Sequence, residues 1–145
     1  MSQPRHILFV CLGNICRSPM AEGVFRHRAQ LRGRGQDFEV DSAGTAAYHV
    51  GELADRRTRE VLAANSIQLE SRARQVDSND FERFDYIFAM DSANYRNLKR
   101  RCPQHFQHKL KMVLEPIGGG DVPDPYYGGS DGFDLNYRQL SEALD

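Results

Sequence analysis

The sequence lacks tryptophan, has only three cysteines, and contains no apolar run that approaches the ~20 residues of a membrane span. So few cysteines, in an odd number, provide no disulfide framework and favour a reducing compartment, so we expect a cytoplasmic protein. The opening MSQPRH lacks the apolar core of a signal peptide. A net charge of −1 argues against nucleic acid or an anionic membrane as the main partner. Without repeats, low-complexity segments or linkers, residues 1–145 are expected to form one domain.

What the sequence does contain is concentrated near its start, in HILFVCLGNICRSPM, residues 6–20. The apolar run 7–10 is short, β-branched and aromatic, which predicts a buried strand. Cys11 follows this strand, and a short loop leads to Arg17. Ser18 and the proline after it are typical of a helix start, with Ser18 at the N-cap. The pattern therefore predicts a cysteine between the end of a strand and the beginning of a helix.

Cys11 and Arg17 are separated by a loop short enough to curl around one tetrahedral oxyanion. Loop amides and the positive end of the helix dipole form an anion site, and that field favours the thiolate form of Cys11. The planar guanidinium of Arg17 can hold two oxygens at once. Ser18 can donate a hydrogen bond to the thiolate, Gly13 lets the backbone approach the anion, and Asn14 tolerates left-handed geometry. These residues suggest phosphoryl transfer through a cysteinyl-phosphate.

A second group of residues lies far downstream, in PDPYY. Asp124 could protonate the leaving oxygen of a phosphate ester, with its flanking prolines aiming the carboxylate. Tyr126 and Tyr127 could wall a cleft and stack on an aromatic leaving group. The alternative is a plain turn, because Asp and Pro are ordinary turn residues. Tyr48 is either a wall of the cleft entrance or an exposed loop tyrosine.

The sequence indicates a function for the other two cysteines less clearly than for Cys11. Cys16 could form a reversible disulfide with Cys11 that protects the nucleophile from over-oxidation, or it could simply pack the loop. Cys102, His105 and His108 are too few to bind a metal without a fourth ligand nearby. We therefore expect no metal and no cofactor.

Strand and helix patterns alternate along the chain. Strands are predicted at 7–10, 38–42, 84–90 and 110–114, and helices at 18–31, at 55–65 with Asp55 as cap, at 91–101 with Asp91 as cap, and in the last segment, where Phe133, Tyr137, Leu140 and Leu144 recur at helical spacing. The polar stretch 70–80 shows no clear pattern. This alternation predicts a three-layer α/β fold with a parallel sheet. Ligands in such folds bind beyond the carboxyl ends of the strands, where Cys11 is placed.

The segment VCLGNICRSPMAE closely resembles the signature of the low-molecular-weight protein tyrosine phosphatases, and DPYY lies where that family has its general acid. Further blocks resemble the family in the family's order: residues 41–45, 48–51, Asp55 with Arg57, 73–75 and 89–91. The resemblance covers nearly the whole chain.

This resemblance implies a four-stranded parallel sheet flanked by helices, and hydrolysis of phosphotyrosine without a metal. It assigns Cys11 as nucleophile, Arg17 as the phosphoryl-binding residue and Asp124 as the acid. It also implies that a larger set contacts substrate or supports the loop: Leu12, Gly13, Asn14, Ile15, Cys16 and Ser18 in the loop, Ser42 beside it, Tyr48 at the cleft entrance, and Tyr126 and Tyr127 beside the acid. Where many relatives have a histidine, this chain has Ser71, so the resemblance leaves open what holds Asn14.

Two other functions fit the same fold. An arsenate reductase would need further resolving cysteines, and only Cys102 lies outside the loop. A phosphocysteine carrier or oxyanion-binding module would hold its phosphate, whereas Asp124 is suited to release it. We expect a monomer that acts on a phosphotyrosine protein or a small aryl phosphate and is inhibited by inorganic phosphate or vanadate.

Overall fold

The computed structural model describes residues 4–123, 125 and 131–144. Within these residues the chain forms a four-stranded sheet of order β2-β1-β3-β4, in which all paired strands are parallel. The strands are β1 (Arg5–Cys11), β2 (Phe38–Gly44), β3 (Tyr86–Ala89) and β4 (Leu110–Met112). All four lie within or overlap the apolar runs that predict them.

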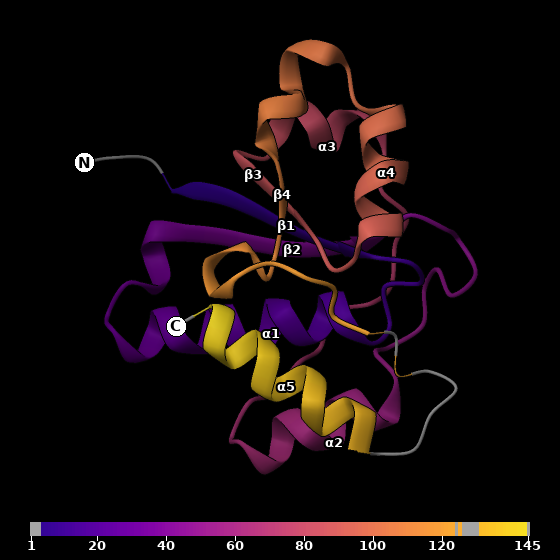
Figure 1. Cartoon of the computed structure of the whole chain (residues 1–145). Coiled ribbons are helices and arrows are strands. Elements are labelled where there is room, and N and C mark those ends of the chain that lie inside the picture. Colours follow the sequence, from indigo (N-terminus) through magenta and orange to yellow (C-terminus); the bar gives the residue numbers. More distant parts are fainter. Residues whose placement is uncertain (1–3, 124, 126–130, 145) are drawn as a thin grey trace.

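Helices cover both faces of the sheet (Figure 1). One face carries α1 (Arg17–Leu31), α2 (Arg56–Ala64) and α5 (Asp131–Ala143), and the other carries α3 (Ser78–Arg83) and α4 (Ser92–Arg101). Short 3₁₀ turns lie at Gly35–Asp37, Gln104–Lys109 and Glu115–Ile117. The arrangement confirms the predicted three-layer α/β fold. None of the helices in the described part of the chain is both long and apolar enough to cross a bilayer.

Strand β1 lies between β2 and β3, and it is buried on both faces because the sheet packs against helices on each side. Its side chains alternate between the two layers. Ile7, Phe9 and Cys11 belong to the apolar cluster under α1 and α5, whereas Leu8 and Val10 belong to the cluster under α3 and α4. This alternation places the sulfur of Cys11 on the α1 side of the sheet.

Two helix starts are capped as the sequence predicts. The carboxylate of Asp55 accepts a hydrogen bond from the amide of Arg57 at 2.8 Å, and that of Asp91 accepts from the amide of Asn94 at 2.7 Å. Each cap satisfies an amide that has no partner inside its helix. Both helices therefore begin one residue after an aspartate at a turn.

Three local features differ from the expectation. Helix α1 begins at Arg17, so Ser18 lies inside its first turn instead of at the N-cap, and its hydroxyl faces Cys11. Strand β2 continues through Gly44, because it stays paired with β1 up to Cys11. The unassigned stretch 70–80 ends in helix α3, which is capped by a reciprocal box between Asp77 and Asp80.

Candidate active site

The sulfur of Cys11 lies at the carboxyl end of the central strand β1, under the loop that leads to α1. Its Sγ is 3.0 Å from the hydroxyl of Ser18, and it accepts the backbone amide of Asn14 at 3.3 Å. Asn14 adopts the left-handed conformation, with φ of 59°. The side chain of Cys11 is nearly enclosed, at 2% exposure. The loop thus wraps back so that two hydrogen-bonding groups converge on the cysteine.

The buried side chain of Asn14 braces this loop from within. Its amide donates to the hydroxyl of Ser18 at 2.8 Å, and its carbonyl oxygen accepts the backbone amide of Arg74 at 3.0 Å. These bonds stabilise the left-handed turn, which carries a conformational cost for a residue with a Cβ. The backbone of Arg74 is therefore what holds Asn14 in a chain that has Ser71 in place of the family histidine.

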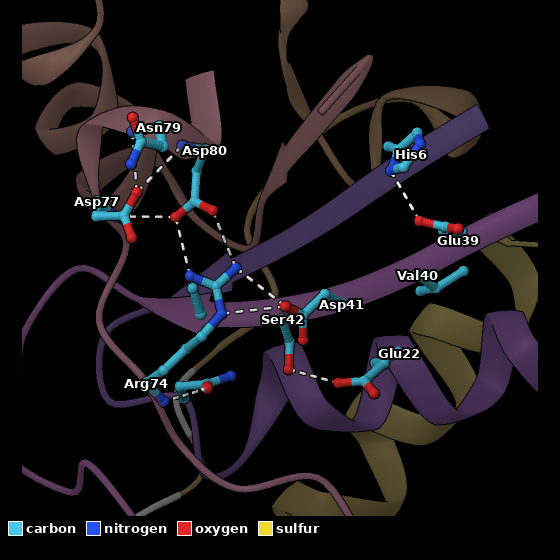
Figure 2. A network of polar contacts seen from close by, with 12 residues as sticks. His6, Glu22, Glu39, Val40, Asp41, Ser42, Arg74, Asp77, Asn79 and Asp80 are labelled. Carbon is cyan, nitrogen blue, oxygen red and sulfur yellow. Dashed lines mark hydrogen bonds and ion pairs between the residues drawn. The ribbon is translucent and has the colours of Figure 1, made fainter. Parts of the chain in front are cut away.

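Arg74 is itself anchored between two elements (Figure 2). Its guanidinium donates two bonds to Asp80 of α3, at 2.9 and 3.1 Å, and one to Asp41 of β2 at 3.0 Å. Burial lowers the pKa of Arg74, but the bonds and charges of these two carboxylates outweigh it and leave the pKa raised. The ion pairs therefore fix the peptide group that holds the loop asparagine.

Ser42 does not contact the loop as expected. Its hydroxyl donates to the carboxylate of Glu22 in α1 at 2.6 Å (Figure 2). Glu22 also pairs with Arg26 at 3.0 Å. Burial raises the pKa of Glu22, and the bond from Ser42 and the charge of Arg26 oppose this shift. Ser42 thus ties β2 to the helix that follows the loop, and its support of the loop is indirect.

The end of β2 holds the near side of the loop through backbone bonds. The amides of Thr45 and Ala46 donate to the carbonyls of Cys11 and Leu12 at 2.9 and 3.0 Å. A Cβ at Gly44 would lie 2.7 Å from the carbonyl oxygen of Leu12, closer than real contacts allow. The absence of a side chain at Gly44 is therefore a condition for the loop to lie against β2.

The start of α2 holds the far side of the loop. The amide of Asp55 donates to the carbonyl of Ile15 at 2.7 Å, and the hydroxyl of Thr58 donates to that of Cys16 at 3.3 Å. The amide of a trans peptide points opposite to its carbonyl, and the described residues contain no cis peptide. The carbonyls of Ile15 and Cys16 point out of the loop, toward α2. The amides of the residues that follow them therefore point toward the inside of the loop, where they form an anion cradle with the start of α1.

Arg17 completes the cradle. Its side chain is 1% exposed, and its Nη1 donates to the carboxylate of Asp91 at 2.5 Å and to the carbonyl of Val122 at 3.0 Å. Asp91 serves two purposes, because one of its oxygens caps α4 and the other orients Arg17. The guanidinium is therefore held from one side by groups that are 74 and 105 residues away in sequence.

The rim of the loop contains the predicted Tyr48 and a residue that sequence analysis did not single out. Tyr48 is 75% exposed, and Leu12 is 42% exposed. The ring of His49 lies over the loop, since a Cβ at Gly13 would be 3.1 Å from its Cδ2. His49 also pairs with Glu52 at 2.8 Å. Tyr48 is thus placed as an exposed side chain beside the loop, and His49 makes the closer contact.

The predicted acid and its neighbours, Asp124, Tyr126 and Tyr127, lie outside the described residues. The segment leading to them is described. Val122 is fully buried, and its amide donates to the carbonyl of Met90 at 2.8 Å while its own carbonyl accepts from Arg17. The chain therefore passes directly beside Arg17 shortly before residue 124.

The three cysteines are all buried, and no disulfide joins them in this structure. Ile15 and Cys16 contribute their side chains to the core cluster that also contains Cys11. Cys102 belongs to the opposite cluster, at the end of α4. Across residues 4–123, 125 and 131–144 no group of histidine, cysteine and carboxylate side chains is arranged to hold a metal ion.

Sequence analysis missed the contributions of Asp91, Arg74 and Gly44 to the site. The sequence identifies Asp91 only as a helix cap. However, Asp91 directly follows a central strand, and ligands in such folds bind at the edge of the sheet where the strands end. Gly44 follows a predicted strand, where glycine often marks a close approach of backbone. Arg74 acts through its backbone amide, and a backbone contact leaves no residue-type signal.

Comparison with known proteins agrees with this geometry. Residues 6–145 match the family model described as low molecular weight phosphotyrosine protein phosphatase. The protein of that name from Schizosaccharomyces pombe is 51% identical over 144 residues, covering 97% of this chain and 92% of that protein. The human protein of that name is 40% identical over 141 residues, with coverages of 93% and 88%. A protein tyrosine phosphatase from Entamoeba histolytica, solved with Hepes in its active site, superimposes with a TM-score of 0.93 at 45% identity, with coverages of 97% and 92%. The chain therefore belongs to the low molecular weight phosphotyrosine protein phosphatase family, a family of hydrolases.

Proposed function

We propose that this chain hydrolyses phosphotyrosine and related aryl phosphates through a phosphorylated Cys11. The observation that carries the proposal is the convergence on its sulfur of the Ser18 hydroxyl and the Asn14 amide, at 3.0 and 3.3 Å. Two such donors stabilise a thiolate, which is the nucleophilic form of cysteine. Cys11 attacks phosphorus opposite the leaving oxygen.

Arg17 and the loop amides hold the phosphoryl oxygens during this attack. Phosphoryl transfer depends mainly on positioning and on stabilisation of the charge on the equatorial oxygens. Asp91 and Val122 hold one end of the guanidinium, so the arginine does not have to be ordered when substrate binds. The preformed cradle is suited to a dianionic phosphate and to its mimic vanadate, and both are expected to inhibit.

Asp124 supplies the proton that the leaving group needs. In the first step the S–P bond forms, the P–O bond to the phenol breaks, and the carboxylic acid of Asp124 gives its proton to the departing oxygen. In the second step Asp124 takes a proton from water, which attacks phosphorus and breaks the S–P bond. The step releases inorganic phosphate and restores the thiolate of Cys11.

The substrate is proposed to be aromatic because tyrosines occur in two segments that follow the loop in the sequence. Tyr48 is exposed beside the loop, and Tyr126 and Tyr127 follow the acid in the sequence. Aromatic side chains stack on a flat phenyl group. We propose that the protein acts as a monomer on phosphotyrosine in a protein or on a small aryl phosphate.

The test is steady-state turnover of an aryl phosphate compared with a phosphoserine peptide. Release of phosphate from the aryl ester is expected to be sustained and to exceed release from the peptide. Cys11→Ser should abolish it, and Asp124→Ala should slow it by about 10²–10⁴-fold, the usual contribution of a general acid. Full activity in either variant would falsify the assignment of that residue.

The same assay separates the two other functions. A single labelling of Cys11 without turnover would identify a carrier. Consumption of thiol that depends on arsenate would identify a reductase. The reductase is disfavoured because Cys102 lies in the core cluster on the other side of the sheet from Cys11.

A further inference from the structure

The two prolines on either side of Asp124 both contact helix α5. The side-chain amide of Asn136 donates to the carbonyl oxygen of Pro123 at 3.0 Å. A Cβ at Gly132 would lie 3.2 Å from the Cβ of Pro125, so this proline packs against the helix backbone there. Residues four apart in a helix share one face. One face of α5 therefore contacts the chain both before and after Asp124.

Asn136 is a polar residue in an apolar environment. Its side chain is fully buried, at 0% exposure, among helix neighbours such as Phe133 and Leu140 that pack into the core. Its carbonyl oxygen, Oδ1, has no hydrogen-bond partner among the described residues. A buried polar atom without a partner costs free energy, and an apolar residue of the same size would avoid that cost. Folding of the core therefore does not explain an asparagine here, whereas its bond to Pro123 does.

Gly132 contributes by having no side chain. A Cβ at Gly132 would lie closer to Pro125 than most real Cβ contacts allow. The atom that it would meet belongs to the rigid ring of Pro125. A larger residue would push the proline away from α5, since proline cannot rotate its side chain aside. The glycine therefore sets how closely the chain after Asp124 approaches the helix.

The chain before Pro123 is attached to a different part of the molecule. The carboxylate of Asp121 accepts the amide and the hydroxyl of Ser92 at 3.0 and 2.8 Å, and Val122 bonds to Met90. These contacts fix residues 121 and 122 beside the phosphate cradle. The bond from Asn136 is the first that turns the chain from the cradle toward α5.

From this placement we propose that Asn136 and Gly132 are positioning residues for the general acid. Asn136 holds the carbonyl of Pro123, and Gly132 lets Pro125 pack closely, so that α5 contacts the residues directly before and directly after Asp124. The inference rests on the proposed role of Asp124. The inference gives helix α5 a part in proton transfer, although α5 has no part in the proposed binding of phosphate.

The test is Asn136→Leu, assayed on aryl phosphates whose phenols differ in acidity. Because leucine has the same branched arrangement of side-chain heavy atoms, with larger methyl ends and no polar atom, we expect stability to change little. The kcat/KM for phenyl phosphate, whose basic leaving group needs the proton, should fall roughly ten- to hundredfold, the scale of a slightly misplaced catalytic group. The kcat/KM for p-nitrophenyl phosphate, whose phenol is acidic, should fall much less. Leu140→Val, a core change one turn along α5, should lower stability and leave the ratio of the two substrates unchanged.

A double variant tests whether Asn136 acts through Asp124. Asn136→Leu added to Asp124→Ala should cause no further loss with phenyl phosphate, because the acid is already gone. Equal losses on both substrates, or a further loss in the Asp124→Ala background, would overturn the inference. Gly132→Ala should reproduce the same dependence on the leaving group, and a loss that is uniform across substrates would count against it. If Asp124→Ala alone keeps full activity on phenyl phosphate, the proposed function fails, and this result is distinct from a failure of Asn136→Leu alone.

Discussion

The two halves of the site are held in different ways. The cysteine loop is fixed from every side, by the end of β2, the start of α2 and the backbone of Arg74, and its polar side chains Asn14 and Ser18 are buried. The segment that leads to the acid is exposed at Asp121 and Pro123, and within the described residues the Asn136 bond is one of the contacts that hold it. The phosphate loop is therefore held by a network of buried bonds, whereas we expect proton transfer to depend on individual contacts such as the bond from Asn136.

This difference predicts where substitutions act. A change outside the loop has to break several bonds before the phosphate cradle opens, so most such changes should alter stability more than binding. A change beside the acid segment should alter the rate and its dependence on the leaving group, with little effect on stability. The following variants test the comparison, from the largest expected effect to the smallest.

Arg17→Lys should have the largest effect. Lysine keeps the charge but cannot hold two phosphoryl oxygens while also donating to Asp91 and Val122. We expect kcat/KM for an aryl phosphate to fall by about 10²–10³-fold, the scale for losing one preorganised donor. Arg26→Lys in the same helix, at an exposed position, is the matched control and should keep full activity. Similar activities for the two variants would mean that charge alone binds the phosphate.

Gly44→Ala should open the cradle from the side of β2. The added Cβ would meet the Leu12 carbonyl at 2.7 Å, and backbone atoms cannot move aside as a side chain can. We expect a loss of about 1–3 kcal/mol in the free energy of unfolding, as for other overpacked sites, with weaker vanadate binding. Gly23→Ala is the control, because its Cβ would meet the ends of side chains, with Leu62 at 3.2 Å and Ile67 at 3.4 Å, and no backbone atom among its nearest neighbours. Denaturant titration and vanadate inhibition measure both effects. Equal vanadate affinity in the two variants would contradict the role given to Gly44.

Arg74→Gln tests the redundancy of the loop network. The substitution leaves the backbone amide that bonds to Asn14 but removes the ion pairs to Asp41 and Asp80. Stability should fall by about 2 kcal/mol, the scale of bonds to charged groups, and kcat/KM should fall only a few-fold. Arg72→Gln removes a bond to the carbonyl of Gly51 and serves as the control. A loss of activity as large as that of Arg17→Lys would show that the loop is not redundantly held.

Glu22→Gln should have the smallest effect, and the effect should depend on pH. Since burial raises the pKa of Glu22 above 4.5, the folded chain holds this proton more tightly than the unfolded chain. The carboxylate therefore costs stability as pH rises from the ordinary value toward the raised one. The free energy of unfolding of the wild type, minus that of the variant, should fall across this window and then level off. Glu60→Gln, at an exposed ion pair, is the matched control. Urea titrations over a pH series measure the difference, and a flat difference for Glu22→Gln would contradict the raised pKa.

Much of the fold could be predicted from the sequence, because apolar runs and aspartate caps act locally. The run ending at Cys11 and the caps at Asp55 and Asp91 placed β1, α2 and α4 within a residue or two. Helix α3 was missed because it has six residues and little apolar pattern, although Asp77 and Asp80 form a recognisable capping box.

The site was predicted where residue types carry the chemistry and missed where the backbone does. Cys11, Arg17 and Ser18 are predicted from their spacing, and in the structure the sulfur of Cys11 lies 3.0 Å from the hydroxyl of Ser18 while Arg17 begins the helix that follows the loop. Successive residues of a strand point to opposite faces, so Asp41 faces Arg74 while Ser42 bonds to Glu22 of α1, and the support that Ser42 gives the loop is indirect. The hold of Arg74 on Asn14 uses a backbone amide and depends on the tertiary fold alone.

The bonds from Arg17 to Asp91 and Val122 have a consequence for how the protein is made. They join residues separated by 74 and 105 positions, so the Arg17 guanidinium is oriented only after most of the chain has been synthesised. Contacts of such long range form late, because the intervening loop must first be closed. A nascent chain therefore exposes Cys11 before Asp91 and Val122 hold Arg17 in place. Catalytic activity appears as the last segments dock, which makes hydrolysis of an aryl phosphate a direct report of complete folding.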